Sequence, residues 1–147
     1  EYIKKLKYSF DFLIASHVIE HVYAIESFIQ ILFSKTKRGG SIFLSLPCTE
    51  SLLLKIFKSR WRGLEAPRHI IIPSKKWFLD LEAKYNCKVK ISYSPICTVW
   101  GSLISFEFFP IFIAAVLGKL IQILTKIFPL TYLSKDFLHV EIKKNNN

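Results

Sequence analysis

Residues 10–22 read Phe-Asp-Phe-Leu-Ile-Ala-Ser-His-Val-Ile-Glu-His-Val, and this stretch decides the fold class. Its first half, up to Ser16, holds a short hydrophobic run that is too short for a helix and typical of a buried strand. Three polar residues then follow closely: His17, Glu20 and His21. We therefore predict a strand over residues 10–16 with chemically active side chains directly after it.

The next segments predict a helix and a second strand. From Val22 to Phe33 the hydrophobic residues recur at helical spacing, and basic residues follow, as at many helix C-termini. Gly39-Gly40 predicts a turn, and Ser41–Leu46 predicts another buried strand, which Pro47 ends. A strand, a helix, a glycine turn and a strand form a parallel βαβ crossover.

The remaining elements alternate in the same way, which predicts an α/β fold. The expected helices are 52–57 and 74–85, the second capped by Ser74, and the expected half-buried strands are 87–93 and 137–142. We divide the chain into a core of strands and helices (10–94), a hydrophobic helical insert (95–130) and a last strand (135–144).

Charge and cysteine content limit the classes of function. The 147 residues carry a net charge of +10, and residues 35–76 hold ten Lys or Arg against two acids. Such a surface attracts phosphorylated substrates, acidic lipids or nucleic acid, although a solvated lysine-rich face explains it equally well. No nucleic-acid-reading motif accompanies it, so we do not expect nucleic acid as a partner. Three cysteines without a CxxC pair exclude a disulfide framework and fit a reducing compartment.

The insert suggests contact with a membrane surface. Its longest hydrophobic run is too short to span a bilayer, which needs about 20 residues. After Pro110, Lys119, Gln122 and Lys126 share one helical face, and hydrophobic residues occupy the rest. This pattern fits a helix lying in the interface, with peripheral contact through residues 103–128. A helix packed on the protein's own sheet is the alternative.

The His17-x-x-Glu20-His21 pattern also matches the inverted zinc-peptidase motif. That motif needs both histidines on one face of a helix, and His17 comes directly off a strand. We therefore do not expect a metallopeptidase.

Three blocks of sequence, in order, resemble class I S-adenosylmethionine-dependent methyltransferases. Residues 10–22 resemble the fourth strand and the turn after it. Residues 32–47 are similar to the helix end and fifth strand written L-x-P-G-G-x-L-x-x-x-x-P. Residues 61–70, Trp-Arg-Gly-Leu-Glu-Ala-Pro-Arg-His-Ile, resemble the W-x-G-L-x-x-P-R-H-L segment of the branch that contains the methyltransferase-23 and ubiquinone-methyltransferase-like enzymes.

The resemblance implies a partial Rossmann-like fold with strands four to seven of a seven-stranded sheet, in the order four, five, seven, six. The family holds its cofactor through a glycine-rich loop after the first strand and an acidic residue after the second. None of the five glycines here forms G-x-G. We therefore expect the chain to be the carboxyl-terminal part of one methyltransferase domain, a view that the initial Glu1 and the absence of methionine favour. The strand at 10–16 would then be an exposed hydrophobic edge.

The resemblance also assigns expected roles. The cofactor would be S-adenosylmethionine, with Ser16, His17 and Val18 lining its pocket; Glu20, Trp61, Arg62 and Arg68 would bind the substrate. His21 or His69 would be the general base. A metal held by His17, Glu20 and His21, by analogy with the family's E-x-x-E-H site, is a weaker alternative. Glu20 and His21 could instead only charge a helix start, Trp61 could be packing and His69 could hold the loop.

The expected reaction is methyl transfer to an oxygen or nitrogen of a small acceptor, which could be lipid-linked, in the cytoplasm or at a membrane face. The alternative is a non-catalytic remnant that binds a membrane or a protein partner.

Overall fold

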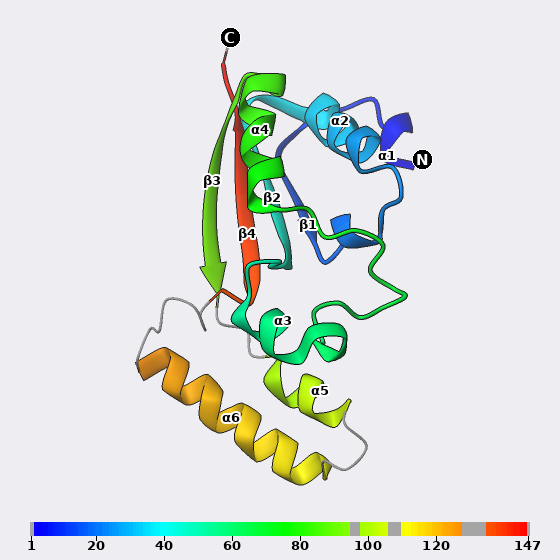
Figure 1. Cartoon of the computed structure of the whole chain (residues 1–147). Helices are drawn as coiled ribbons and strands as arrows, with labels where there is room; N and C mark the ends of the chain where they lie inside the picture. The colour runs from blue at the N-terminus through cyan, green and yellow to red at the C-terminus, as the bar shows by residue number, and fades with distance from the viewer. Residues whose placement is uncertain (1, 95–97, 106–109, 128–134, 147) are drawn as a thin grey trace. The chain divides into compact units, whose positions relative to one another are not determined.

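The computed structural model describes residues 2–94, 98–105, 110–127 and 135–146 (Figure 1). Its elements in chain order are α1 (Tyr2–Lys5), β1 (Phe10–Ser16), the 3-10 turn η1 (Ile19–His21), α2 (Ile25–Lys35), β2 (Thr36–Pro47), α3 (Leu52–Phe57), the 3-10 turn η2 (Lys58–Arg60), α4 (Lys75–Tyr85), β3 (Cys87–Ser94), α5 (Val99–Ile104), α6 (Ile111–Ile127) and β4 (Phe137–Lys144). The predicted α/β class is confirmed.

The chain forms two compact units. Unit 1 consists of Glu1–Leu46, Ile70–Ser92 and His139–Asn147, and unit 2 of Pro47–His69 and Tyr93–Leu138. The predicted insert, 95–130, therefore lies in unit 2 together with the loop that precedes residue 70. Residues 95–97, 106–109 and 128–130 of the insert, with Cys97 and Glu107, lie outside the described residues.

The sheet has the strand order β1-β2-β4-β3, with β1 and β2 parallel. This is the order four, five, seven, six that the sequence predicts. In the described chain β1 is an edge strand, and Phe12 and Ile14 on it are 66% and 77% exposed. The exposed hydrophobic edge is therefore present as predicted.

Helices α2 and α4 cover one face of this sheet (Figure 1). Strands place alternate side chains on opposite faces, and the residues of β2 and β4 that point toward the helices are buried. The core of unit 1 includes Ile29, Leu32, Phe33, Ile42, Leu44, Phe78, Leu81, Val140 and Ile142. The other face carries Phe12, Ile14, Phe43, His139 and the lysines of β3, and no described helix of unit 1 covers it.

The predicted glycine turn is wrong. Gly39 and Gly40 lie inside β2. Phe10 of β1 pairs with Thr36 of β2, and Phe12 pairs with Ser41, so the chain advances two residues along β1 but five along β2. Gly39 has a φ of +72°, and a Cβ on Gly40 would lie 2.8 Å from the carbonyl oxygen of Asp11. Both glycines therefore form a bulge that only residues without side chains tolerate.

Helix α4 begins after the Ser74 cap, as the sequence predicts. The Ser74 hydroxyl accepts a hydrogen bond from the Trp77 amide at 3.2 Å, and the Asn86 residue after the helix has a φ of +47°. Glu82 at the end of α4 then accepts the Val89 amide of the edge strand β3 at 2.7 Å. An edge amide that is satisfied in this way is less open to pairing with another chain.

Unit 2 is organised around a buried carboxylate, Asp136. Its Oδ2 accepts the Thr98 amide at 2.9 Å, and its Oδ1 lies 3.2 Å from the Ser51 hydroxyl and 3.3 Å from the Trp61 indole nitrogen. The Asp136 carbonyl also accepts the Cys48 amide. Burial raises the pKa of Asp136, and these hydrogen bonds oppose that rise.

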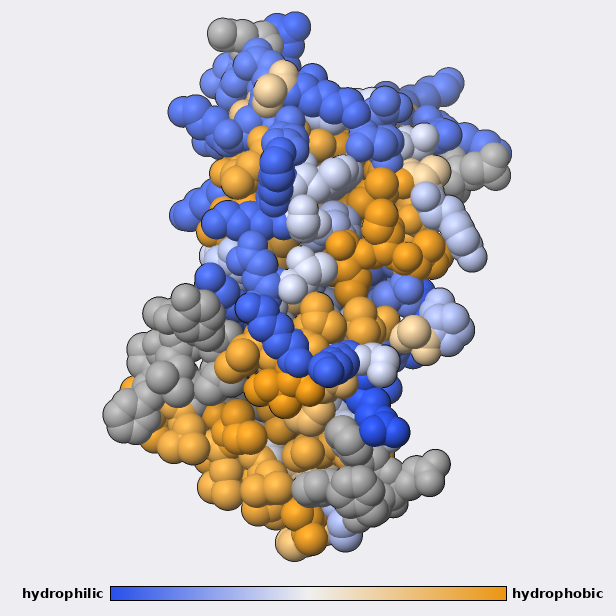
Figure 2. Space-filling model, in the orientation of Figure 1, coloured by the Kyte–Doolittle hydropathy of each residue, from blue (hydrophilic) through white to orange (hydrophobic). Residues whose placement is uncertain are grey.

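Helix α6 packs on α5 in unit 2, and its surface is hydrophobic (Figure 2). None of the described helices is long and hydrophobic enough to cross a membrane.

Candidate functional site

The candidate site of unit 1 is the segment that leaves β1. His17 has a φ of +54°, a left-handed conformation that costs free energy for any residue except glycine. Its amide donates to the Ser45 carbonyl at 2.8 Å, so pairing with β2 continues one residue past the strand before the chain turns. Ser16, His17 and Val18 are all exposed at this turn. Backbone strain at a strand end, with open side chains, is typical of a ligand site.

Glu20 lies behind this exposed turn, in η1. Its side chain is completely buried, and its Oε1 is 3.4 Å from His17 Nδ1. The Glu20 carbonyl accepts the Ile70 amide at 2.8 Å, which fixes η1 against the chain that leads to α4. Two expectations therefore need correction. Glu20 and His21 do not open a helix, since α2 begins only at Ile25, and the buried Glu20 carboxylate offers no surface to a substrate.

The same geometry excludes the zinc-peptidase motif. His17 precedes a 3-10 turn of three residues and has a left-handed backbone, so His17 and His21 do not share the face of a helix. His21 itself is half-buried. A metal at His17, Glu20 and His21 stays a prediction.

His139 is a nearby group whose position the sequence did not reveal. It is half-buried on the face of the sheet that no described helix of unit 1 covers. Burial lowers the pKa of His139, and the charge of His17 lowers it further. Alternation along β4 could have placed His139 on this face, but its proximity to His17 depends on the strand order.

A separate candidate group lies in unit 2 and consists of two arginines on one carboxylate. Arg62 Nη2 and Arg68 Nη1 lie 2.9 Å and 2.8 Å from the same oxygen, Oε1 of Glu65. Both arginine side chains are more than half exposed. Two guanidinium charges beside one Glu65 carboxylate give this loop a local positive charge that attracts anionic groups.

His69 is held inside this loop. Its Nδ1 lies 2.8 Å from the Gly63 carbonyl, and because a carbonyl only accepts, Nδ1 carries the proton. Its Nε2 faces Glu65 Oε2 at 3.5 Å, and the side chain is buried. The loop-holding role therefore fits the structure, and the general-base role of His69 stays a prediction.

Trp61 is also a core residue, which corrects its expected role in substrate binding. It is buried, and its indole nitrogen donates to the Thr98 hydroxyl at 2.9 Å and to Asp136 at 3.3 Å. A Cβ on Gly63 would lie 2.3 Å from the Trp61 ring, so the glycine makes room for the indole. No face of the ring is open for stacking.

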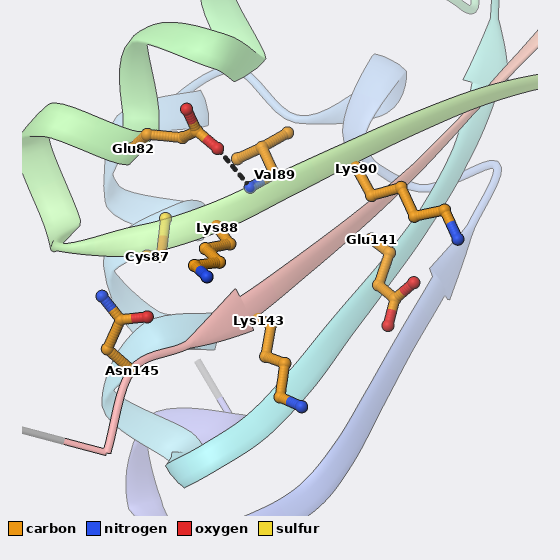
Figure 3. A pocket seen from close by; sticks show the side chains of 8 residues that line it. All are labelled: Glu82, Cys87, Lys88, Val89, Lys90, Glu141, Lys143 and Asn145. Carbon is orange, nitrogen blue, oxygen red and sulfur yellow. Dashed lines mark hydrogen bonds between the residues drawn. The ribbon is translucent and has the colours of Figure 1, made fainter.

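A hollow of about 610 Å³ lies in unit 1 on β3 and β4, which run in opposite directions (Figure 3). Three lysines and two glutamates are among its lining residues, which are Glu82, Cys87, Lys88, Val89, Lys90, Glu141, Lys143 and Asn145. It includes the start of β3 and the end of β4, whereas ligands of open α/β sheets bind beyond the carboxyl ends of the parallel strands. Burial, with a smaller contribution from Glu82, raises the pKa of the Cys87 thiol to about 11, so this thiol is not a nucleophile at neutral pH.

Comparison with solved structures identifies the architecture. A S-adenosylmethionine-dependent methyltransferase from Archaeoglobus fulgidus matches with a TM-score of 0.57 and 20% identity, over 97% of this chain and 63% of that chain. The fold is that of the class I S-adenosylmethionine-dependent methyltransferases. A possible histamine N-methyltransferase from Thermotoga maritima matches with a TM-score of 0.55 and 15% identity, over 97% and 61% of the two chains.

A third solved structure shows the same fold. A putative sarcosine dimethylglycine methyltransferase from Galdieria sulphuraria has a TM-score of 0.58 and 14% identity, over 99% of this chain and 58% of that chain. The chain thus spans about three fifths of the length of these structures. No protein-family model and no curated protein sequence matches it.

Proposed function

We propose that this chain is the carboxyl-terminal part of a methyltransferase domain of the ubiquinone-methyltransferase-like branch. It would take part in methyl transfer from S-adenosylmethionine to an oxygen or nitrogen of a small acceptor. The observation that carries the proposal is the sheet order β1-β2-β4-β3, combined with a strained, exposed turn at the carboxyl end of β1.

The residues present fit one side of the cofactor. Ser16, His17 and Val18 are exposed where a ligand of such a sheet would bind, and would line its methionine side. When bound, the cofactor supplies a methyl group on a positively charged sulfur. The glycine-rich loop and ribose-binding acid of the family do not occur in this sequence, so the chain offers only part of the binding site.

The chain's own groups would position the acceptor and accept its proton. Arg62 and Arg68 would bind a carboxylate or phosphate of the acceptor, because both are cationic side chains that are more than half exposed. His21 and His69 are the candidates for the general base, because imidazole is the side chain best suited to proton transfer at neutral pH. Positioning and proton removal are the contributions that a protein makes to this reaction.

One observation favours the second candidate, a non-catalytic binding module: no G-x-G occurs among the five glycines. Such a module would not respond to S-adenosylmethionine or to its demethylated product, S-adenosylhomocysteine.

Titration of isotope-labelled protein with S-adenosylhomocysteine, followed by amide NMR, separates the two functions. We expect weak binding, with shifts concentrated at residues 16–21 and little change at residues 87–90 of the hollow. Shifts centred on the hollow, or none at millimolar ligand, would remove the support for a cofactor site at the end of β1.

A further inference from the structure

Helix α6 in unit 2 exposes hydrophobic side chains along its whole length. Phe112 is the most exposed at 78%. The other exposed hydrophobic residues are Ile111, Ile113, Val116, Leu117, Leu120, Ile123, Leu124 and Ile127. Figure 2 shows the resulting hydrophobic surface over this helix. Soluble domains rarely leave so continuous a hydrophobic surface without a partner.

Small residues attach the opposite side of α6 to the protein. Ala114 is completely buried, and a Cβ on Gly118, one turn later, would lie 2.6 Å from Trp100 Cβ of α5. At 100° per residue, Val116 and Ile123 lie roughly opposite this seam. The hydrophobic face of α6 therefore points away from its own unit, and it is not an interior helix of unit 2.

A lysine borders the hydrophobic face. Lys119 is exposed, and at 100° per residue it lies beside Phe112 on the helix surface; the sequence of α6 holds one further charged residue, Lys126. Within unit 2, eight Lys or Arg stand against four acids. The helix thus combines a wide hydrophobic face with positive charge at its margin.

We propose that α6 is a docking surface for the interface of an anionic lipid bilayer, with the helix lying in the membrane plane. Its 17 residues span about 25 Å at the usual rise, which is less than a bilayer core of about 30 Å. The hydrophobic side chains would enter the acyl boundary while Lys119 at their margin meets lipid phosphates.

Charge distinguishes a bilayer from a second copy of the chain. Pairing two α6 helices face to face would bring Lys119 of each copy into the contact, and neither α6 nor α5 offers an acid to neutralise these lysines. An anionic surface neutralises the same lysines directly. The proposal is independent of the methyltransferase assignment, since lipid binding needs no cofactor.

Sedimentation of the 147-residue chain with vesicles tests the proposal. The vesicles are equal parts phosphatidylglycerol and phosphatidylcholine, compared with phosphatidylcholine alone, at low and at high salt. We expect binding to the anionic vesicles that weakens with salt. Phe112→Glu should lower it about tenfold or more, because one large hydrophobic group leaves the lipid.

Matched variants locate the contact. Phe12→Glu on the exposed edge strand β1 makes the same chemical change at another exposed site and should bind as the wild type does. The double variant Lys119→Gln, Lys126→Gln should lose about tenfold or more on anionic vesicles, whereas Lys88→Gln, Lys90→Gln on β3 should lose much less. Circular dichroism of each variant confirms that its fold is retained.

Three outcomes would overturn the proposal. These are no binding to either vesicle, equal losses for Phe112→Glu and Phe12→Glu, and a dimer in sedimentation velocity that Phe112→Glu dissociates while vesicles capture nothing. The last result would assign α6 to self-association.

Discussion

Replacing Asp136 by alanine should destabilise the chain far more than an aspartate replacement on its surface. The carboxylate is buried and accepts the Thr98 amide, the Ser51 hydroxyl and the Trp61 indole. In Asp136→Ala the backbone bond from Cys48 survives, and Trp61 keeps the Thr98 hydroxyl at 2.9 Å. The Thr98 amide has no such second acceptor in the described part of unit 2 and would be left buried without one.

The magnitude follows from these losses and one gain. A buried amide without an acceptor costs about 1–3 kcal/mol, and each further hydrogen bond to a charged group contributes about 1.5–3 kcal/mol. Burial raises the pKa of Asp136, which means that its charged form is costly to bury. The substitution removes this desolvation cost and so offsets part of the lost stability. We expect a net loss of about 2–4 kcal/mol in the free energy of unfolding.

Asp80→Ala is the matched control. Asp80 is exposed on α4 and pairs with Lys76, four residues earlier, at 2.8 Å. Such a pair contributes about 0.5 kcal/mol or less. Urea unfolding at pH 7, followed by circular dichroism and tryptophan fluorescence, measures both variants. In Asp136→Ala the emission of native protein should also shift to the red as Trp61 becomes hydrated.

Similar stabilities for the two variants, with unchanged emission, would overturn this expectation. Asp136 would then not organise unit 2, and the placement of Trp61 in the core rather than at a substrate would lose its support.

The remaining predictions concern the end of β1. His17→Gly should be more stable than His17→Ala by about 1 kcal/mol in urea unfolding, because only glycine adopts the left-handed backbone freely; equal stabilities would mean that residue 17 is not held there. The lowered pKa of His139 means that the unfolded chain binds a proton more readily, so stability should fall as pH drops below about 6.5, and His139→Gln should reduce this loss. A flat profile for the wild type would contradict it. His17→Gln should raise the pKa of His139 in an NMR titration, because it removes a neighbouring positive charge.

Local patterns in the sequence predicted most elements of the fold. The hydrophobic run before Ser16, the Ser74 cap and the alternation after Cys87 each depend on neighbours within a few residues, and each element appears where expected. Gly39 and Gly40 were misplaced because a bulge depends on register with β1, which no local pattern encodes.

The candidate site was predicted less completely, since burial depends on distant partners. Trp61 is buried and donates a hydrogen bond to Asp136, which lies 75 residues later in the chain. The loop sequence around Trp61 contains no sign of this partner and therefore predicts an exposed side chain. The sequence predicts that Glu20 begins a helix, whereas in the structure Glu20 lies in a 3-10 turn and is buried beside His17. The exposure of Ser16, His17 and Val18 followed from their place after a strand, because strand ends in such sheets reach the surface.

Whether this chain holds one side of a methyltransferase cofactor site can be decided by calorimetric titration with S-adenosylhomocysteine. The titration compares the 147-residue chain with the chain extended by the coding sequence directly upstream of Glu1. We predict that the extension contains a strand followed by a G-x-G loop and that the extended chain binds with a Kd of about 1–100 μM, whereas the 147 residues alone bind with a Kd of about 1 mM. Micromolar binding by the 147 residues alone, or no binding by an extended chain that carries the loop, would contradict the proposed cofactor site.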